Sequence, residues 1–136
     1  MGFLIQGVCR KLWCRSGYDK IISTLYNKAL EGVSHITTPQ VNSEEDPFSL
    51  YVIKVDKNRD SFAVDLRNAG IETGLYYIPL HLLSYYKSKY SLRVNDFPVA
   101  LRTYQQVLAL PLYASMDEKQ VKFVIDSVKK IAKTRV

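Results

Sequence analysis

Apolar residues between positions 18 and 30 repeat with the period of an α-helix. Seven of them follow an i, i+3, i+4, i+7 pattern: Tyr18, Ile21, Ile22, Leu25, Tyr26, Ala29 and Leu30. This pattern places the side chains along one side of a helix, which a core must then cover. Ser16 is suited to cap the start of the helix and Gly32 to end it. We predict an amphipathic helix over residues 18–30.

The last part of the chain carries a second helical repeat. Six apolar residues share one helical face: Val121, Val124, Ile125, Val128, Ile131 and Ala132. Upstream, Ser115 and Glu118 have the spacing of a capping box, in which two side chains and two backbone N–H groups satisfy one another. We predict a helix that this box starts and that packs its apolar face on a sheet.

Two predicted strands flank a third helix in the middle of the chain. Residues 49–55 and 71–77 are rich in β-branched and aromatic side chains, which favour strands. Between them, residues 59–69 have helical apolar spacing and are followed by Gly70, which can adopt the left-handed conformation that closes a helix. If the two strands are parallel, we expect their connection to be right-handed.

The second of these strands delivers three polar-tipped rings to one loop. Gly74 within it indicates a bulge or a close backbone approach, and Pro79 ends it because proline cannot donate a ladder hydrogen bond. Tyr76, Tyr77 and His81 are therefore expected at the strand end and in the loop beyond it. Loops of this kind are where binding and catalytic residues concentrate.

The remaining segments complete an α+β domain. We predict a loop over 34–47 with a short extended piece at 37–39, a short helix over 81–90, a helix from Pro98 to about Val107 with Asp96 as its N-cap, and a strand over 108–112. The sum is a single small domain over residues 16–136, with a small mixed sheet covered by helices. An N-terminal segment, residues 1–15, stands apart from it.

The composition excludes several classes of protein. Of the 136 residues, 47% are hydrophobic and 24% are charged, fractions that are typical of a globular domain. No run approaches the roughly 18 apolar residues of a membrane span, and the N-terminus lacks the basic region of a signal peptide. We therefore expect a cytoplasmic protein with no membrane partner.

The formal net charge of +6 leaves a second function class open. Basic residues gather near both ends, and Tyr86 and Tyr90 lie four residues apart, where they could form an aromatic platform. One hypothesis is therefore a stand-alone basic and aromatic module that binds an anionic ligand or RNA. Against it, cations suit the C-terminal end of the last helix, such tyrosines ordinarily pack, and no RNA-recognition or zinc-finger signature is present. Nucleic acid is the less expected partner.

The cysteines do not indicate a metal site. Cys9 and Cys14 lack the two-residue gap of redox and zinc motifs. With His35 and His81 as the only histidines, a tetrahedral site would need every cysteine and histidine in the chain. We expect two reduced thiols and no metal.

One stretch resembles a known family. Residues 70–81 read Gly-Ile-Glu-Thr-Gly-Leu-Tyr-Tyr-Ile-Pro-Leu-His and are similar to a signature in the C-terminal part of pyridoxal phosphate (PLP)-dependent sugar aminotransferases of the DegT/DnrJ/StrS type. Tyr76 stands where the signature has its first histidine, whereas Tyr77 and His81 match. Further segments resemble the family in the same order: 49–55, Arg59-Asp60, 96–100 and 108–113. The resemblance covers about residues 18–134 and leaves residues 1–15 unmatched.

The resemblance implies a fold and a site. The fold is that of the C-terminal small domain of fold-type I PLP-dependent transferases, and the substrate-binding residues are Tyr76, Tyr77 and His81, which face the pocket for a sugar nucleotide. Tyr76 lacks the imidazole of the family pattern. His81 also has a purely structural alternative, in which it caps the short helix that follows.

The resemblance also implies what the chain lacks. A transaminase needs a lysine that forms a Schiff base with PLP, a carboxylate at the pyridine nitrogen and a phosphate cup. In the family these belong to the large N-terminal domain, upstream of the matching segments. Ser115 and Lys119 imitate the spacing around the family's lysine, but helix capping explains them. We expect no catalytic residue and no cofactor in this chain, although PLP is implied for the complete enzyme.

The expected partners follow from that reading. A missing large domain or partner subunit would be needed to transfer an amino group from glutamate to a keto sugar in polysaccharide or amino-sugar biosynthesis, and the chain alone is expected to be inactive. A third hypothesis is a remnant of a broken gene, whose uncovered domain interface promotes a homo-oligomer.

Overall fold

The computed structural model describes residues 17, 19–40, 49–113 and 115–135. Its elements are a helix over residues 19–30, β1 (Ile36–Thr37), β2 (Tyr51–Val55), α2 (Arg59–Asn68), the 3₁₀ helix η1 (Leu80–Leu82), α3 (Ser84–Tyr90), α4 (Pro98–Gln106), β3 (Val107–Leu110) and α5 (Glu118–Lys133). The expectations for residues 1–15, Ser16, Tyr18 and most of the loop before β2 lie outside the described residues.

The sheet is small and antiparallel. β2 lies between β1 and β3, with Ile36 opposite Val55 and Tyr51 opposite Leu110. Alternate residues of β2 (Tyr51, Ile53 and Val55) are buried, so one face of the sheet packs on the core. The α+β class is confirmed, but the sheet is antiparallel throughout the described residues, where a mixed sheet was predicted.

The strand predicted over residues 71–77 does not form. Only Gly74 pairs with β3, through an isolated bridge in which its N–H donates to Ala109 O (3.0 Å) and the Ala109 N–H donates to Gly74 O (2.9 Å). The ring of Tyr76 then lies against Gly74, where a Cβ would collide with it, and the chain turns away before a second pair forms. The strand–helix–strand unit is therefore absent, while the predicted close approach at Gly74 is confirmed.

The ends of α2 follow from local chemistry. Asn58, in the left-handed conformation that asparagine tolerates, accepts from the Ser61 N–H at its Oδ1 (3.3 Å). At the other end Gly70 has a φ of 85°, the Gly70 N–H donates to Arg67 O (2.9 Å) and the Ile71 N–H donates to Leu66 O (2.9 Å). These two bonds are those of a Schellman motif, so the predicted glycine stop is confirmed.

Two predicted helix caps are wrong. The capping box of α5 is made by Asp117 and Gln120 instead of Ser115 and Glu118: the Gln120 N–H donates to Asp117 Oδ1 (2.7 Å), and the Asp117 N–H donates to Gln120 Oε1 (3.0 Å). α4 has no side-chain cap, because Asp96 Oδ2 accepts from the Arg93 N–H (2.8 Å). At α5, Asp117 lies next to the predicted box and its carboxylate accepts the hydrogen bond that was expected for Ser115. At α4, the Asp96 carboxylate accepts from the backbone of its own loop and so does not cap the helix.

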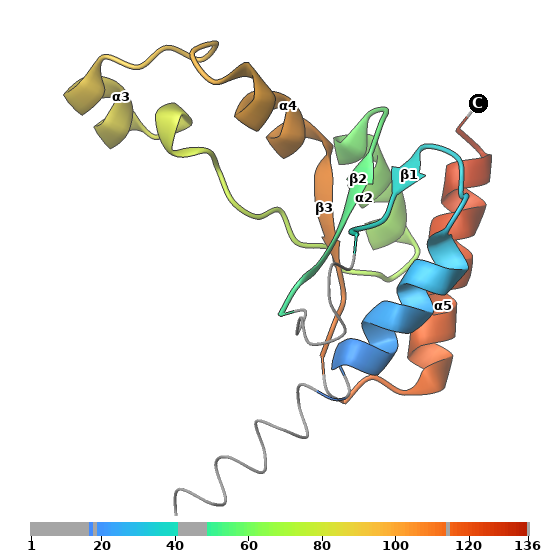
Figure 1. Ribbon diagram of the computed structural model, residues 1–136. Coiled ribbons are helices and arrows are strands. Elements are labelled where there is room, and N and C mark those ends of the chain that lie inside the picture. The colour runs from blue at the N-terminus through green and yellow to red at the C-terminus, as the bar shows by residue number, and fades with distance from the viewer. Residues whose placement is uncertain (1–16, 18, 41–48, 114, 136) are drawn as a thin grey trace, which may run out of the picture.

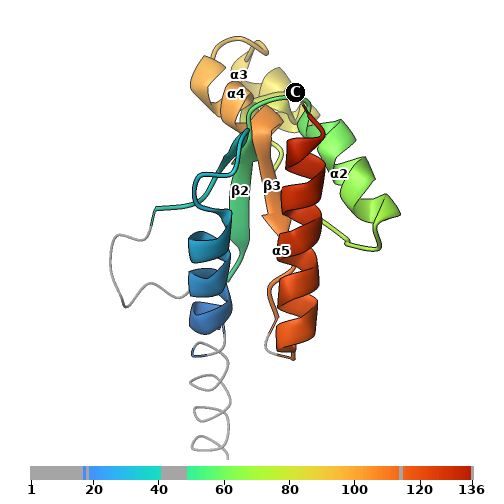
Figure 2. The ribbon, with the colours of Figure 1, turned by 90° about the vertical axis from the view of Figure 1, so that its right-hand side faces the viewer.

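One layer of helices covers the buried face of the sheet. The helix over residues 19–30 and α5 lie side by side over the strands, with α2 next to α5 (Figure 2). The fully buried side chains from these elements include Tyr26, Leu30, Tyr51, Ile53, Phe62, Leu66 and Val128. The helical stripes predicted over residues 18–30 and 121–132 supply much of this core, but the prediction is wrong for Ile21 and Leu25 of the first stripe, which are exposed.

Two tyrosines are buried inside this core with their hydroxyls paired. Tyr26 Oη donates to Pro111 O (2.9 Å), Tyr51 Oη donates to Asn27 Oδ1 (2.6 Å), and the two rings lie 4.9 Å apart between centroids. Burial raises the pKa of both hydroxyls well above the ordinary value of 10.0. The neutral hydroxyls therefore tie the helix over residues 19–30 to β2 and to the segment after β3.

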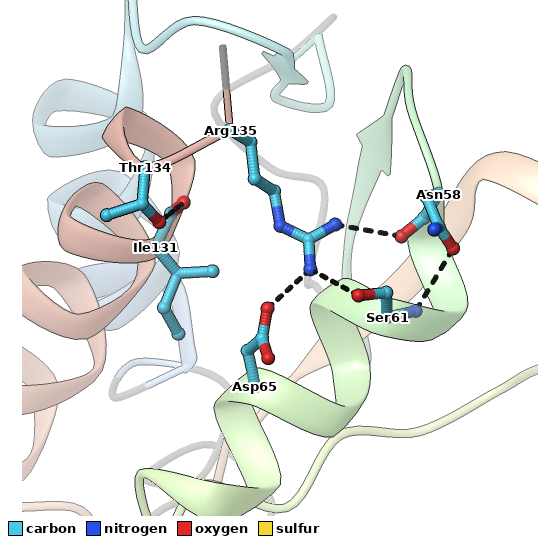
Figure 3. Close-up of polar contacts among 6 residues, drawn as sticks. All are labelled: Asn58, Ser61, Asp65, Ile131, Thr134 and Arg135. Carbon is cyan, nitrogen blue, oxygen red and sulfur yellow. Dashed lines mark hydrogen bonds and ion pairs between the residues drawn. The ribbon is translucent and has the colours of Figure 1, made fainter.

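The C-terminal end is fastened to α2 by one arginine (Figure 3). Arg135 donates through Nη1 to Asn58 O (3.0 Å) and through Nη2 to Ser61 Oγ (2.9 Å), and it forms an ion pair with Asp65. Its guanidinium also lies 5.2 Å from the centre of the Phe62 ring. The planar fork of arginine thus holds the end of α5 against the first turns of α2.

A long excursion leaves the sheet after Gly74 and returns as β3. We call residues 75–99 the arm; it contains η1, α3 and the start of α4, and α3 is its part farthest from the sheet (Figure 1). No apolar side chain of the arm belongs to the buried core of the described residues. The molecule thus consists of a packed body and a projecting arm.

Candidate functional site

The predicted site lies at the root of the arm. Gly74 fixes its start through the bridge to Ala109, and the Tyr76 ring lies against the glycine. The rings of Tyr76 and Tyr77 lie 5.6 Å apart between centroids, and 45% and 79% of these two side chains are exposed. The two adjacent phenol rings are therefore exposed to solvent, two and three residues after the backbone position that the Gly74–Ala109 bridge fixes.

His81 is not part of this exposed pair. It lies in η1 and is 4% exposed, its ring is 5.2 Å from that of Phe97, and its Nε2 is buried with no hydrogen-bond partner among the described residues. It does not cap α3 either, because that helix has no side-chain cap. The structure brings Tyr76 and Tyr77 together, whereas His81 packs inside the arm.

A hollow runs beside Tyr76 along the edge of β3. Its smaller part has a volume of about 250 Å³ and is lined by Thr73, Gly74 and Tyr76, among others. A larger part of about 810 Å³ extends to α5, and the two share Glu72 and Pro111 in their linings. The larger part is lined by apolar side chains, among them Ile71, Phe123 and Val124, and by the polar side chains of Glu72, Asp117, Lys119 and Gln120.

Arg59, which the sequence analysis named only as part of the family-like segment Arg59-Asp60, has a structural role that it did not predict. It is 7% exposed, its Nη1 donates to Val107 O (3.0 Å), its Nε lies 2.7 Å from Asp60 Oδ1, and its guanidinium is 5.6 Å from the centre of the Tyr104 ring. It therefore joins α2 to α4 and β3 at the place where the arm returns to the body. A cation in the first turn of a helix opposes the helix dipole, and this was the available signal for a specific tertiary role.

The tyrosine pair predicted on the short helix is confirmed. Tyr86 and Tyr90 stack with centroids 6.4 Å apart and an angle of 12° between rings, and Lys89 Nζ lies 5.5 Å from the centres of both Tyr85 and Tyr90. These rings pack on one another and on a cation within α3.

The described residues do not fit PLP. A Schiff-base lysine works from an enclosed site where its environment lowers its pKa. None of the lysines in residues 19–40, 49–113 and 115–135 is buried; Lys119 lines the larger hollow, but it too is exposed. We therefore derive no step of a transamination from these residues.

The same described part of the chain contains neither a cluster of metal ligands nor a membrane-spanning helix. Among the described residues, no three His, Cys, Asp or Glu side chains are grouped so that they could hold a metal ion. None of the described helices combines the length and the apolar character that a bilayer crossing requires. Cys9 and Cys14 lie outside the described residues.

Comparison with known proteins gives a consistent result. The model of the DegT/DnrJ/EryC1/StrS aminotransferase family matches residues 18–129. The chain is 32% identical over 116 residues to the uncharacterized protein MJ1066 of Methanocaldococcus jannaschii, an alignment that covers 81% of the chain and 30% of MJ1066. It is also 32% identical over 119 residues to the spore coat polysaccharide biosynthesis protein SpsC of Bacillus subtilis, covering 82% of the chain and 31% of SpsC.

The solved structures agree with the sequence comparison. DesV of S. venezuelae, solved in complex with a ketimine intermediate, superposes with a TM-score of 0.87 at 27% identity, and the match covers 98% of this chain and 36% of DesV. The chain thus spans about a third of the length of the proteins it matches. Its sequence signature, its α+β architecture and these matches lead to one conclusion: the chain belongs to the DegT/DnrJ/EryC1/StrS aminotransferase family.

Proposed function

We propose that this chain acts as the C-terminal small domain of a cytoplasmic, PLP-dependent sugar-nucleotide aminotransferase, and that it does not transaminate alone. The observation that carries the proposal is the family match over residues 18–129, combined with coverage of only about 30% of the relatives' length. The burial of the lysines supports the second part, because a Schiff-base lysine works from an enclosed site and none of the lysines in the described residues is buried. In the complete enzyme, PLP would supply the carbanion-stabilising chemistry from the large domain.

The reaction we assign to the complete enzyme is transfer of an amino group from glutamate to a keto sugar carried on a nucleotide. This proposal is supported by what the relatives are called: SpsC is a polysaccharide biosynthesis protein, and a Shewanella sediminis relative, 26% identical over 117 residues, is a UDP-4-amino-4-deoxy-L-arabinose–oxoglutarate aminotransferase. Neither comparison supports the alternative of a stand-alone module for an anionic ligand or RNA.

Tyr76 and Tyr77 would form part of the wall of the substrate pocket. Their exposed rings offer apolar faces for a sugar or base, and their hydroxyls can donate to or accept from sugar hydroxyls. His81 would act from behind them: its buried ring packs on Phe97 and holds η1, the element that follows the tyrosines. Tyr76 stands where the family signature has a histidine, so in this chain a phenol hydroxyl would take the place of the imidazole in the pocket wall.

The first experiment tests the chain alone. The purified chain is incubated with PLP and borohydride, and the labelled lysines are identified by mass spectrometry. We expect weak labelling spread over many lysines, because none of those in the described residues lies in an enclosed site. Stoichiometric labelling of one lysine would contradict the proposal.

The second experiment supplies the missing part. Residues 18–134 replace the matching 119-residue segment of SpsC, and the hybrid is assayed for glutamate-dependent amination of keto sugar nucleotides. We expect turnover by the hybrid and none by the chain. A folded hybrid that binds PLP but transfers no amino group to any of these substrates would count against the assignment.

A further inference from the structure

We propose that the larger part of the hollow beside α5 binds a small molecule that has an apolar, preferably aromatic, body and one positively charged amino group. We call this part the α5 hollow, and its lining residues come from the segments 70–72, 111–113 and 116–124. The inference goes beyond the proposed function and does not require it, because every residue involved belongs to this chain.

The α5 hollow is separate from the two tyrosines assigned to the substrate pocket. None of its lining residues lies in the arm, and Tyr76 lines only the smaller part, which shares Glu72 and Pro111 with it. Its volume of about 810 Å³ lies within the range of roughly 300–1,000 Å³ that is usual for small-molecule sites. The α5 hollow is therefore large enough to hold a ligand of its own.

Backbone hydrogen bonds and core packing fix the walls of the α5 hollow. The Ile71 N–H donates to Leu66 O (2.9 Å), and the Met116 N–H donates to Tyr113 O (3.0 Å). The side chains of Ile71, Met116 and Val124 are buried and belong to the core. Because these walls are formed before a ligand enters, binding requires little further ordering of the chain.

Two half-exposed aromatic rings line the α5 hollow. Tyr113 is 43% exposed and Phe123 is 52% exposed. Outside the arm, they are the only aromatic side chains of the described residues that are exposed to this extent. Contact with a ligand would remove further ring surface from water, and the faces of both rings attract cations. The rings thus favour a ligand that is apolar or aromatic and positively charged.

The charged groups that line the α5 hollow select the charge of the ligand. They are two carboxylates, Glu72 and Asp117, and one ammonium group, Lys119, so one negative charge remains. Neither Glu72 nor Lys119 forms a hydrogen bond or an ion pair within the part of the chain that the structure describes. An anionic ligand would be repelled by the remaining charge, whereas a monocation would be attracted.

The start of α5 does not reverse this preference. The first N–H groups of a helix can bind an anion, but here the Gln120 N–H donates to Asp117 Oδ1 (2.7 Å) and the Asp117 N–H donates to Gln120 Oε1 (3.0 Å). The capping box therefore puts a carboxylate where a phosphate would bind, which disfavours sugar nucleotides and PLP. Because Asp117 and Gln120 already bond to each other, few polar groups remain for the hydroxyls of a free sugar.

The test is a titration of the isotopically labelled 136-residue chain with three ligands of similar shape, followed by NMR. Phenethylamine carries the amino group, phenylethanol is neutral and phenylpropionate is an anion. We expect phenethylamine to bind with a Kd on the order of millimolar, as suits so small a ligand, and to shift the amide signals of residues 70–72 and 116–124. The affinity should be at least ~10-fold lower for phenylpropionate, lower for phenylethanol, and reduced by added salt.

Two variants with matched controls locate the ligand. Phe123→Ala should weaken the binding of phenethylamine at least ~5-fold, whereas Val64→Ala, at an equally exposed position of α2 outside the hollow, should not. Glu72→Gln should remove most of the preference for the amine over the alcohol. Glu31→Gln makes the same change at an exposed residue just after the helix over residues 19–30 and should keep that preference.

Several results would overturn the inference. They are absence of phenethylamine binding, equal or tighter binding of phenylpropionate, shifts confined to other residues, and equal effects of a variant and its control. Each of these results leaves the proposed function standing, because borohydride labelling and the SpsC hybrid test that function. A hybrid without turnover, conversely, leaves the ligand site of the α5 hollow standing.

Discussion

The body and the arm of this domain are built on opposite principles. In the body, apolar stripes from three helices close over one face of a three-stranded sheet, and side chains such as Tyr26, Phe62 and Leu66 are fully buried. In the arm, most large apolar side chains are exposed, and the one buried titratable side chain is His81. The buried side chains of the body therefore account for most of the stability of the chain, whereas the exposed side chains of the arm contribute little to it. Substitutions should therefore have very different effects in the two regions.

The largest expected effect is in the body. Phe62→Ala removes a ring that is 1% exposed and contacts Arg135, and should lower the free energy of unfolding by about 3–5 kcal/mol. Tyr77→Ala in the arm should change it by less than about 0.5 kcal/mol, because the ring is 79% exposed. Urea unfolding of both variants measures the contrast. Similar losses would show that the arm is part of the folding core.

The second largest expected effect is a loss of stability of the body at alkaline pH. Burial raises the pKa of Tyr26 and Tyr51 above 10.0, so above about pH 10 the unfolded chain loses protons that the folded chain keeps. The unfolded state then binds fewer protons, and stability falls as pH rises, by up to about 1.4 kcal/mol per pH unit for each tyrosine. Unfolding followed between pH 9 and pH 12 tests this. Tyr51→Phe should remove about half of the tyrosine contribution to the fall of the free energy of unfolding with pH. If the slope of unfolding free energy against pH stays unchanged in this variant, the prediction is wrong.

Substitutions at the junction between body and arm should lower the free energy of unfolding by a smaller amount. Arg59→Met removes the donor to Val107 O and the cation over Tyr104, and should cost about 2 kcal/mol. Arg59→Lys keeps the charge but loses the fork, so we expect only partial recovery. Hydrogen exchange should show faster opening of α4 and β3 in both variants. An effect confined to α2 would argue against a role for Arg59 in holding the arm.

The smallest expected effect is at the root of the site. Gly74→Ala places a Cβ against the Tyr76 ring, which must move, and should cost about 1 kcal/mol. Adding Tyr76→Ala removes the clash, so the double variant should be more stable than the sum of the single effects implies. A strictly additive cycle would mean that the ring does not lie on Gly74 in solution.

Much of the fold could be predicted from local pattern. The apolar repeats indicated the helix over residues 19–30 and α5, the glycine after Ala69 indicated the end of α2, and Pro98 indicated the start of α4. These features depend on residues a few positions apart, so a single segment contains all the information. The shift of the capping box from Ser115 to Asp117 shows the limit of such patterns, because two overlapping candidates of similar chemistry competed.

The sequence by itself determined the helices, the α+β class and the signature over residues 70–81 by which the family is recognised. Only the tertiary structure decided that residues 71–77 pair with β3 at Gly74 alone, that His81 packs on Phe97, and that Arg59 is buried at the base of the arm. Each of these depends on a partner 16 or more residues away along the chain, and hydrophobic periodicity holds no record of such a contact. The division between a packed body and an exposed arm follows from these long-range contacts, which the pattern of neighbouring residues does not record.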